Sequence, residues 1–235
     1  MDLAALAPTP LEMEALGLSL RVSLWAVAGS LPVGILTALV LARRRFPGKT
    51  LVNGLVHLPL ILPPVVVGYL LLVLLGRRGV VGAWLHDWFG VTVAFTWKGA
   101  AIAAAVMAFP LMVRAIRLSI EGVDRRLEDA ARTLGAGPLR IFATVTLPLI
   151  LPGILTGTIL AFARSVGEFG ATITFVSNIP GETRTLPLAL FTQTQVPGGE
   201  AAALRLVVIS VVLAMAAVVL SEVLARRVAR HGADP

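Results

Sequence analysis

The sequence predicts an all-α integral membrane protein with five membrane-spanning helices. Hydrophobic residues make up 57% of its 235 residues and charged residues only 14%, whereas about a quarter of a soluble domain is charged. This composition places the chain in the membrane class. The apolar residues form five runs, each long enough to cross a bilayer, which takes about 20 residues, and the backbone of such a span is satisfied internally by a helix. The runs are residues 17–42, 51–75, 99–120, 139–166 and 204–225.

The basic residues give these spans an orientation. They cluster after the first span, between the third and fourth spans, and after the fifth. Thirteen of the twenty basic residues therefore fall on one side, which is assigned to the cytoplasm. These are Arg43, Arg44, Arg45, Lys49, Arg114, Arg117, Arg125, Arg126, Arg132, Arg140, Arg226, Arg227 and Arg230. The N-terminus is expected outside and the C-terminus inside, and the net charge of +7 reflects this topology and not a nucleic-acid partner.

The domain organisation follows from the spans. Residues 17–227 are expected to form one transmembrane domain, followed by a cytoplasmic tail over 228–235. Residues 1–16 have no Lys or Arg, so they lack the basic start of a cleavable signal peptide. We expect them to form a short N-terminal tail on the outer side, mobile or interfacial.

The second span is expected to be broken. It contains Pro59, Pro63, Pro64 and Gly68, and proline removes a backbone donor and clashes with the preceding helical turn. The break can be packing geometry, or it can line a transport pathway, as broken helices near the membrane midplane often do. The concentration of prolines favours the pathway.

The connection between the second and third spans is rich in tryptophan. The connection over residues 76–98 contains Trp84, Trp88 and Trp97, which predicts an outer hairpin or interfacial helix. Anchoring to the membrane explains these tryptophans more simply than a soluble partner does.

Gly153-x-x-x-Gly157 in the fourth span permits close helix contact, either within the subunit or at a dimer seam.

A short polar helix is predicted over about residues 124–135, between the third and fourth spans. Asp124 can cap its first turn, and Gly135, Gly137 and Pro138 end it. Leu127, Ala130, Ala131 and Leu134 fall on one small, Ala-rich stripe, as a helix that docks into a groove requires. Glu128 and Arg132 are expected to pair four residues apart on the polar side.

The spacing in this segment resembles the EAA loop of ABC-importer permeases, E-A-A-x3-G-x9-I-x-L-P. Here it is Asp129-Ala130-Ala131, then Gly135, then Val145-x-Leu147-Pro148. The resemblance implies a cytoplasmic coupling helix that inserts into a cleft of a separate ATPase subunit. Asp129 stands for Glu and Val145 for Ile, and Glu128 lies one residue early, so either acid can fill the motif's acidic position. The residues to which the resemblance assigns ATPase coupling are Glu128, Asp129, Ala130, Ala131, Arg132, Leu134, Gly135, Leu147 and Pro148.

Residues 164–185, RSVGEFGATITFVSNIPGETRT, place ionisable groups at the end of an apolar span. Arg164 and Glu168 are either functional, as intramembrane charges commonly are, or a structural ion pair at the outer rim, and both interpretations stand. The apolar stretch beyond Gly170 is too short to span and is expected to be re-entrant or packed on a dimer surface.

No catalytic or metal chemistry can be assembled from the sequence. Pro47-Gly48-Lys49-Thr50 lacks the earlier glycine and the strand of a phosphate-binding loop, so ATP is expected to be hydrolysed on another chain. The three histidines show no ligand spacing and there is no cysteine, so no metal and no cofactor are expected.

From about Leu18 to Arg227 the chain resembles bacterial molybdate permeases, most specifically in HLPLILPPVVVGYLLL, FPLMVRAIRLSIEGVD and GEFGATITFVSNIPGETRT. The resemblance implies a type I ABC importer fold in the bacterial inner membrane, with a periplasmic N-terminus. It also implies a homodimer surrounded by membrane lipid, two cytoplasmic ABC ATPase subunits, a periplasmic oxyanion-binding protein, and transport by alternating access. The candidate residues of the pathway or gate are Pro63, Pro64, Arg164, Ser165, Glu168 and Thr172.

Several alternatives stay open. Sulfate permeases share the EAA loop and a similar glycine–glutamate element, so a sulfate or tungstate importer is the nearest rival to a molybdate importer that also accepts tungstate. A passive channel would not need the polar helix, and an intramembrane enzyme would need ionisable groups within the spans, whose apolar cores hold almost none.

Overall fold

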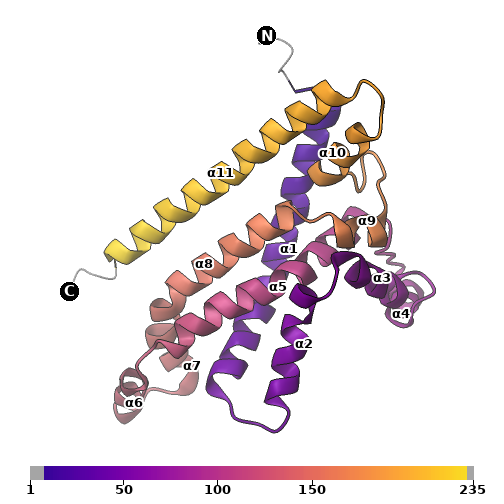
Figure 1. Cartoon of the computed structure of the whole chain (residues 1–235). Coiled ribbons are helices and arrows are strands. Elements are labelled where there is room, and N and C mark those ends of the chain that lie inside the picture. Colours follow the sequence, from indigo (N-terminus) through magenta and orange to yellow (C-terminus); the bar gives the residue numbers. More distant parts are fainter. Residues whose placement is uncertain (1–7, 232–235) are drawn as a thin grey trace.

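The computed structural model describes residues 8–231, and every regular element within them is a helix (Figure 1). Side chains at 218, 220–222 and 224–231 lie outside the description, as do residues 1–7 and 232–235 of the two predicted tails. The basic side chains predicted to follow the fifth span are among them. The elements are α1 (Pro10–Arg43), α2 (Lys49–Ile61), α3 (Pro64–Leu75), α4 (Val80–Phe89), α5 (Trp97–Glu121), α6 (Arg125–Thr133), α7 (Pro138–Ile141), the π-helical turn η2 (Phe142–Thr146), α8 (Leu147–Val166), α9 (Gly170–Val176), α10 (Leu186–Thr194) and α11 (Glu200–His231).

Four of the predicted spans are single long helices. They are α1, α5, the continuous segment Pro138–Val166, and α11 over Glu200–Ala217. The predicted span 51–75 is instead α2 followed by α3, bent by 115° across a short break. The described chain therefore has four helices that are long and apolar enough to cross a membrane, or five spans when the bent pair is one broken span. The break at Leu62 and Pro63 confirms the prediction from the prolines.

The first helix begins earlier than its predicted span. Thr9 and Glu12 form a capping box, in which the Glu12 carboxylate accepts a 2.7 Å hydrogen bond from the Thr9 N–H. Glu12 is buried and also lies 2.9 Å from the Arg205 guanidinium of α11. Residues 10–16 are therefore not a mobile segment, because the Thr9-x-x-Glu12 capping signal starts the helix at Pro10, whereas an interfacial position for them stays a prediction.

Helix α5 is the centre of the fold and packs against α1 and α8 (Figure 1). In its most apolar stretch 61% of the residues are buried, against 28% in α1 and 6% in α11. Small residues make this packing close. A Cβ atom added at Gly157 of α8 would lie 3.0 Å from the Met112 carbonyl oxygen of α5, and one at Gly153 would collide with Ser119. The Gly153-x-x-x-Gly157 pair is therefore a packing surface within the subunit.

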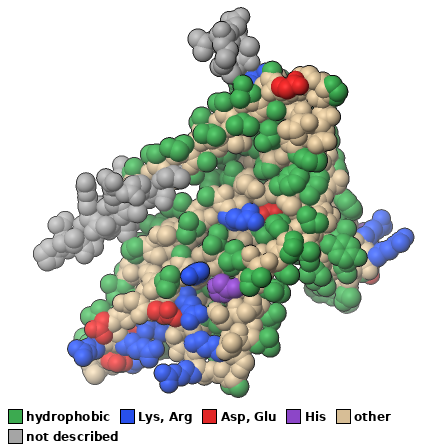
Figure 2. All heavy atoms as spheres, viewed as in Figure 1, with side chains coloured by type: hydrophobic (Ala, Val, Ile, Leu, Met, Phe, Trp, Pro, Cys, Tyr) green, Lys and Arg blue, Asp and Glu red, His purple; other side chains and the backbone are tan. Residues whose placement is uncertain are grey.

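Charged and apolar side chains are unevenly distributed along the length of the molecule. Figure 2 shows most charged side chains gathered at the end that carries α6 and the turn between α1 and α2. A smaller group of Lys and Arg lies at the opposite edge, with a largely hydrophobic surface between the two. At the other end lie α4, α9 and α10 (Figure 1). The tryptophan-rich connection contains helix α4, whose Trp84 and Trp88 are exposed. This arrangement is that of a membrane protein with one strongly basic side.

Candidate functional site

The predicted polar helix is α6, which begins and ends close to the expected residues. The Asp124 carboxylate caps it by accepting a 2.9 Å hydrogen bond from the Arg126 N–H. The helix ends at Thr133, and Gly135 has a φ of +79°, a conformation that glycine adopts without strain. The capping residue and the terminating glycine are both confirmed.

Glu128 fixes α6 to the rest of the molecule. Its Oε1 accepts hydrogen bonds from Arg43 Nη2 at the end of α1 (2.8 Å) and from the Thr146 hydroxyl of η2 (2.9 Å). The Glu128 side chain is only 12% exposed. Three elements thus meet at one carboxylate, which we call the Glu128 clamp, comprising Arg43, Glu128 and Thr146.

The predicted Glu128–Arg132 pair is wrong. Glu128 turns inward to the clamp, and Arg132 instead pairs at 2.5 Å with Asp129, with both side chains more than 60% exposed. The prediction failed because it used spacing within α6 alone, whereas the stronger partner, Arg43, lies 85 residues away in the chain. Of the two candidate acids, Asp129 is therefore the one that faces outward.

The apolar stripe of α6 also faces away from the protein. Leu134 is 87% exposed, Leu127 is 49% exposed, Ala130 is exposed and Ala131 is half-buried. Leu139 of α7, beside it in the chain, is 84% exposed. Leucines exposed on a polar helix outside the membrane spans are characteristic of a docking surface.

The last part of the motif lies at a π-helical turn that the sequence analysis missed. Leu147 and Pro148 begin α8 directly after η2. Pro148 has no N–H with which to bond to the Thr144 carbonyl one turn back, so the regular helix is interrupted at this point. In the sequence, the signal that could have predicted this turn is Pro148 following the two threonines Thr144 and Thr146. The turn presents Thr146 to the clamp.

The broken second span and the segment after the fourth span meet in space. A Cβ atom added at Gly170 would lie 2.7 Å from Pro64 Cβ, and one added at Gly68 would lie 2.5 Å from the Ala171 carbonyl oxygen. Helices α3 and α9 therefore touch almost backbone to backbone. The two stretches that the sequence analysis assigned to the pathway form one packed unit, which we call the α3–α9 unit.

Glu168 lies in the turn between α8 and α9, directly before this unit. Its Oε2 lies 2.7 Å from Arg164 Nη1 in an ion pair that lacks hydrogen-bond geometry, and its Oε1 accepts a 2.8 Å bond from the Ala171 N–H at the start of α9. The Thr172 hydroxyl donates to the Phe169 carbonyl (2.8 Å), and the Ser165 hydroxyl is buried without a hydrogen-bond partner. Pro63, at the N-cap of α3, adjoins Pro64 of the same unit. The predicted pathway residues are thus brought together, with most of their polar groups engaged locally.

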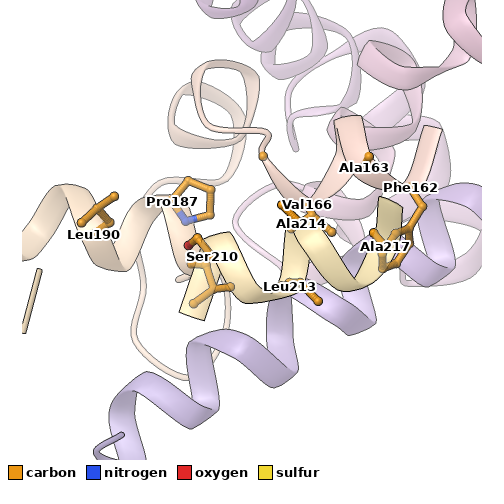
Figure 3. A pocket seen from close by; sticks show the side chains of 11 residues that line it. Phe162, Ala163, Val166, Pro187, Leu190, Ser210, Leu213, Ala214 and Ala217 are labelled. Atoms are coloured by element: carbon orange, nitrogen blue, oxygen red, sulfur yellow. The ribbon is translucent and has the colours of Figure 1, made fainter. Parts of the chain in front are cut away.

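The cavity at the end of α8 does not have the lining expected of an oxyanion site. This cavity, of about 390 Å³, is lined by apolar side chains of α8, α10 and α11, and only Ser210 is polar among the labelled residues in Figure 3. A doubly charged anion in such surroundings would lack compensating charge. Among the side chains that the structure describes there is likewise no group of three or more potential metal ligands.

Comparison with known proteins places this geometry in context. Residues 30–230 match the family model described as binding-protein-dependent transport system inner membrane component. The chain is 66% identical over 215 residues to the molybdenum transport system permease protein ModB of Escherichia coli strain K12, covering 92% of this chain and 94% of that protein. It is 37% identical over 220 residues to the sulfate transport system permease protein CysW of a Synechocystis strain, covering 94% and 79%. A crystal structure of a bacterial ABC transporter involved in the import of alginate superposes with a TM-score of 0.74 at 20% identity, covering 96% of this chain and 82% of that one.

Proposed function

Since the chain belongs to the inner membrane components of binding-protein-dependent transport systems, we propose that it is the permease subunit of an ATP-driven molybdate importer. The observation that carries the proposal is helix α6, which holds the motif residues outside the membrane spans with their apolar face free. A passive channel has no need of such a helix. Tungstate, an anion of the same shape and charge, is expected to be accepted.

Coupling to ATP hydrolysis is assigned to α6 and its surroundings. Asp129, Ala130, Ala131, Arg132 and Leu134 lie on or beside its outer face and would contact a separate ABC ATPase subunit. Glu128 would act from inside, by passing the motion of α6 to α1 and to the base of α8 through the clamp. Gly135 shapes the end of the helix, and Leu147 and Pro148 begin α8, the span that receives the motion.

The transport pathway is proposed to form between two copies of the chain. Helix α2 has no buried residue and α11 buries only 6% of its most apolar stretch, so large apolar faces remain for a second copy and for lipid. The cavity at the end of α8 does not suit an anion, which supports a pathway completed by the partner copy. The α3–α9 unit, with Pro63, Pro64, Arg164, Ser165, Glu168 and Thr172, is proposed as its gate.

Selection among oxyanions is assigned to a periplasmic binding protein. Molybdate, tungstate and sulfate are all tetrahedral dianions that differ mainly in size, so a permease cavity separates them poorly, and discrimination requires a partner built to reject the wrong anion. The higher identity to a molybdenum permease than to a sulfate permease supports molybdate as the substrate.

Uptake measurements test this function. Cells without their own molybdate permease would receive this chain together with its ATPase and binding protein, and uptake of molybdate, tungstate and sulfate would be compared. We expect molybdate and tungstate to enter in an ATP-dependent manner and sulfate to be largely excluded. Sulfate uptake without molybdate uptake would overturn the substrate assignment, and uptake that persists without the ATPase would favour a channel.

The membrane orientation is also a proposal. The Arg43–Glu128 contact places the connections after α1 and after α5 at the same end of the molecule, which is the strongly basic end. We propose that this end is cytoplasmic and that the N-terminus is periplasmic. Reporter fusions after Lys49 and after Arg230 should report the cytoplasm and a fusion near Thr92 the periplasm. A cytoplasmic signal near Thr92 would contradict the topology.

A further inference from the structure

A groove of about 650 Å³ runs between α1 and α5, which pack side by side (Figure 1). We call it the α1–α5 groove, and its lining contains no residue of the Glu128 clamp or of the α3–α9 unit. Its walls are almost entirely apolar or small. The lining residues are Trp25, Ala26, Gly29, Ser30, Trp97, Lys98, Ala101, Ile102, Ala105 and Val106.

One end of the groove is basic. The Arg21 guanidinium stacks 3.8 Å above the ring of Trp97, and Lys98 lines the groove beside it. Among the described carboxylates neither cation has an ion-pair partner, although Glu182 accepts a 3.1 Å hydrogen bond from the Trp97 N–H. Stacking uses the face of a guanidinium and leaves the N–H groups on its edge able to bind an anion.

The basic end lies at the depth of a lipid headgroup. Arg21 precedes Arg43 by 22 residues of continuous helix, or about 33 Å, which matches a hydrocarbon core of about 30 Å. With Arg43 at one membrane boundary, Arg21 reaches the other. Trp25 and Trp97, whose ring centroids are 6.3 Å apart, mark the same interface. From Lys98 to Val106 the groove descends about 12 Å along α5 into the hydrocarbon region.

We propose that the α1–α5 groove binds an anionic phospholipid, with its phosphate on Arg21 and Lys98 and an acyl chain along the apolar walls. The charge pattern favours this occupant over a second copy of the chain. A twofold contact through this face would bring the same patch of each copy together. The patch has Lys98 in its lining and Arg21 stacked on the lining residue Trp97, with no carboxylate among the lining residues. A free oxyanion would find charge only at the rim, because the depth of the groove is apolar.

Gly29 offers a direct way to close the groove. A Cβ atom added at Gly29 meets nothing within 4 Å, and neither does one added at Gly54 of α2, which lies outside the groove. Both glycines are helical, so leucine at either position improves helix propensity. Gly29→Leu should fill the groove without disturbing the fold, and Gly54→Leu is the matched control.

The test is native mass spectrometry of the permease purified with its ATPase and titrated with dioleoyl phosphatidylglycerol or dioleoyl phosphatidylcholine. We expect retained phosphatidylglycerol in the wild type and in Gly54→Leu, and reduced retention in Gly29→Leu. Replacing Arg21 and Lys98 by glutamine should weaken retention about tenfold or more, because each basic residue adds to binding of an anionic headgroup. Equal retention of both lipids, or retention unchanged in all groove variants, would overturn the proposal.

Cysteine chemistry gives an independent test. The chain has no cysteine, so Gly29→Cys introduces a single thiol into the groove. Oxidation in the membrane should leave this variant monomeric on a denaturing gel if lipid fills the groove. A disulfide-linked dimer would assign the groove to a second copy and overturn the lipid proposal. Copurification of the ATPase shows that each variant is folded, and neither test depends on transport or on the substrate.

Discussion

Two buried glutamates differ in what they hold together. Glu128 pairs with Arg43, 85 residues away, and also binds Thr146, so one carboxylate joins α6, α1 and η2. Glu168 pairs with Arg164, four residues before it, and caps the Ala171 N–H three residues after it. The first glutamate defines tertiary structure, whereas the second defines only the local turn from α8 to α9.

Helix α6 and the α3–α9 unit are held in place in two different ways because they bury different amounts of surface. Helix α6 lies outside the spans and buries little apolar surface, so a charged clamp is needed to hold it while its outer face stays free for a partner. The α3–α9 unit is held by close backbone packing at Gly68 and Gly170. Its position therefore does not rest on Glu168 alone, and we propose that the Glu168 charge has a role in gating.

The largest effect is expected from Gly68→Ala. The new methyl group would lie 2.5 Å from the Ala171 carbonyl oxygen, and backbone cannot move aside as a side chain can. Overpacking of this kind typically costs about 1–3 kcal/mol. The thermal unfolding midpoint of the purified permease–ATPase complex should fall, together with molybdate uptake.

Gly54→Ala is the matched control for this prediction. Gly54 lies in the other half of the same broken span, and an added Cβ atom meets nothing within 4 Å. Alanine should not lower the unfolding midpoint and should stabilise α2 by up to about 1 kcal/mol. If Gly68→Ala behaves like Gly54→Ala, the α3–α9 unit is not held by backbone contact, and the contrast between the two regions fails.

Glu128→Gln should have the next largest effect. It removes the charge from two hydrogen bonds while keeping an oxygen that can accept them, and the difference between a charged and a neutral hydrogen bond is about 1 kcal/mol. Residues 125–133 should exchange amide hydrogen faster in the permease, and uptake per ATP hydrolysed should fall. Glu121→Gln is the control, because Glu121 pairs with Arg117 on an exposed helical face.

A charge swap tests whether α6 is held by the Arg43–Glu128 contact itself or only requires an acidic side chain at position 128. The double variant Arg43→Glu with Glu128→Arg restores opposite charges at the same positions and should recover part of the slow exchange. If the increase in amide exchange in the double variant equals the sum of the increases in the two single variants, the Arg43–Glu128 contact is not what holds α6.

Glu168→Gln should leave assembly intact and change turnover. The glutamine side-chain oxygen can still accept the Ala171 hydrogen bond, so the cap persists while the ion pair with Arg164 is lost. Glu168→Ala removes the cap as well and should destabilise the start of α9 by about 1 kcal/mol. Uptake turnover would be measured at saturating binding protein. Wild-type turnover in Glu168→Gln would assign the pair to structure alone.

The sequence predicted what depends on local chemistry. The cap at Asp124, the turn at Gly135 and the break at Pro63 all followed from residue type and were confirmed, because each is fixed by neighbours in the chain. Five apolar runs gave the helical membrane fold for the same reason. The overlooked capping box at Thr9 and Glu12 was equally local, and could have been found.

What the sequence could not predict depends on contacts between distant segments. The partner of Glu128 is Arg43, and nothing in the spacing of α6 indicates it, so the nearer Arg132 was chosen wrongly. The contact of Gly68 with Ala171 likewise joins segments about a hundred residues apart. The pathway residues themselves stay a prediction, since their roles depend on a second copy and on substrate.

The smallest effect on the permease itself is expected from Asp129→Asn, and this variant separates the two acids of the motif. Asp129 and Arg132 form an exposed pair, and such pairs contribute about 0–1 kcal/mol. Hydrogen exchange and the unfolding midpoint of the permease should therefore stay close to wild type, in contrast to Glu128→Gln. Affinity for the ATPase subunit, measured by copurification at increasing salt, should nevertheless fall, because Asp129 points toward the proposed docking partner. If Asp129→Asn binds the ATPase normally while Glu128→Gln does not, the acidic role in coupling belongs to the buried clamp, and the outer face of α6 docks through its apolar residues alone.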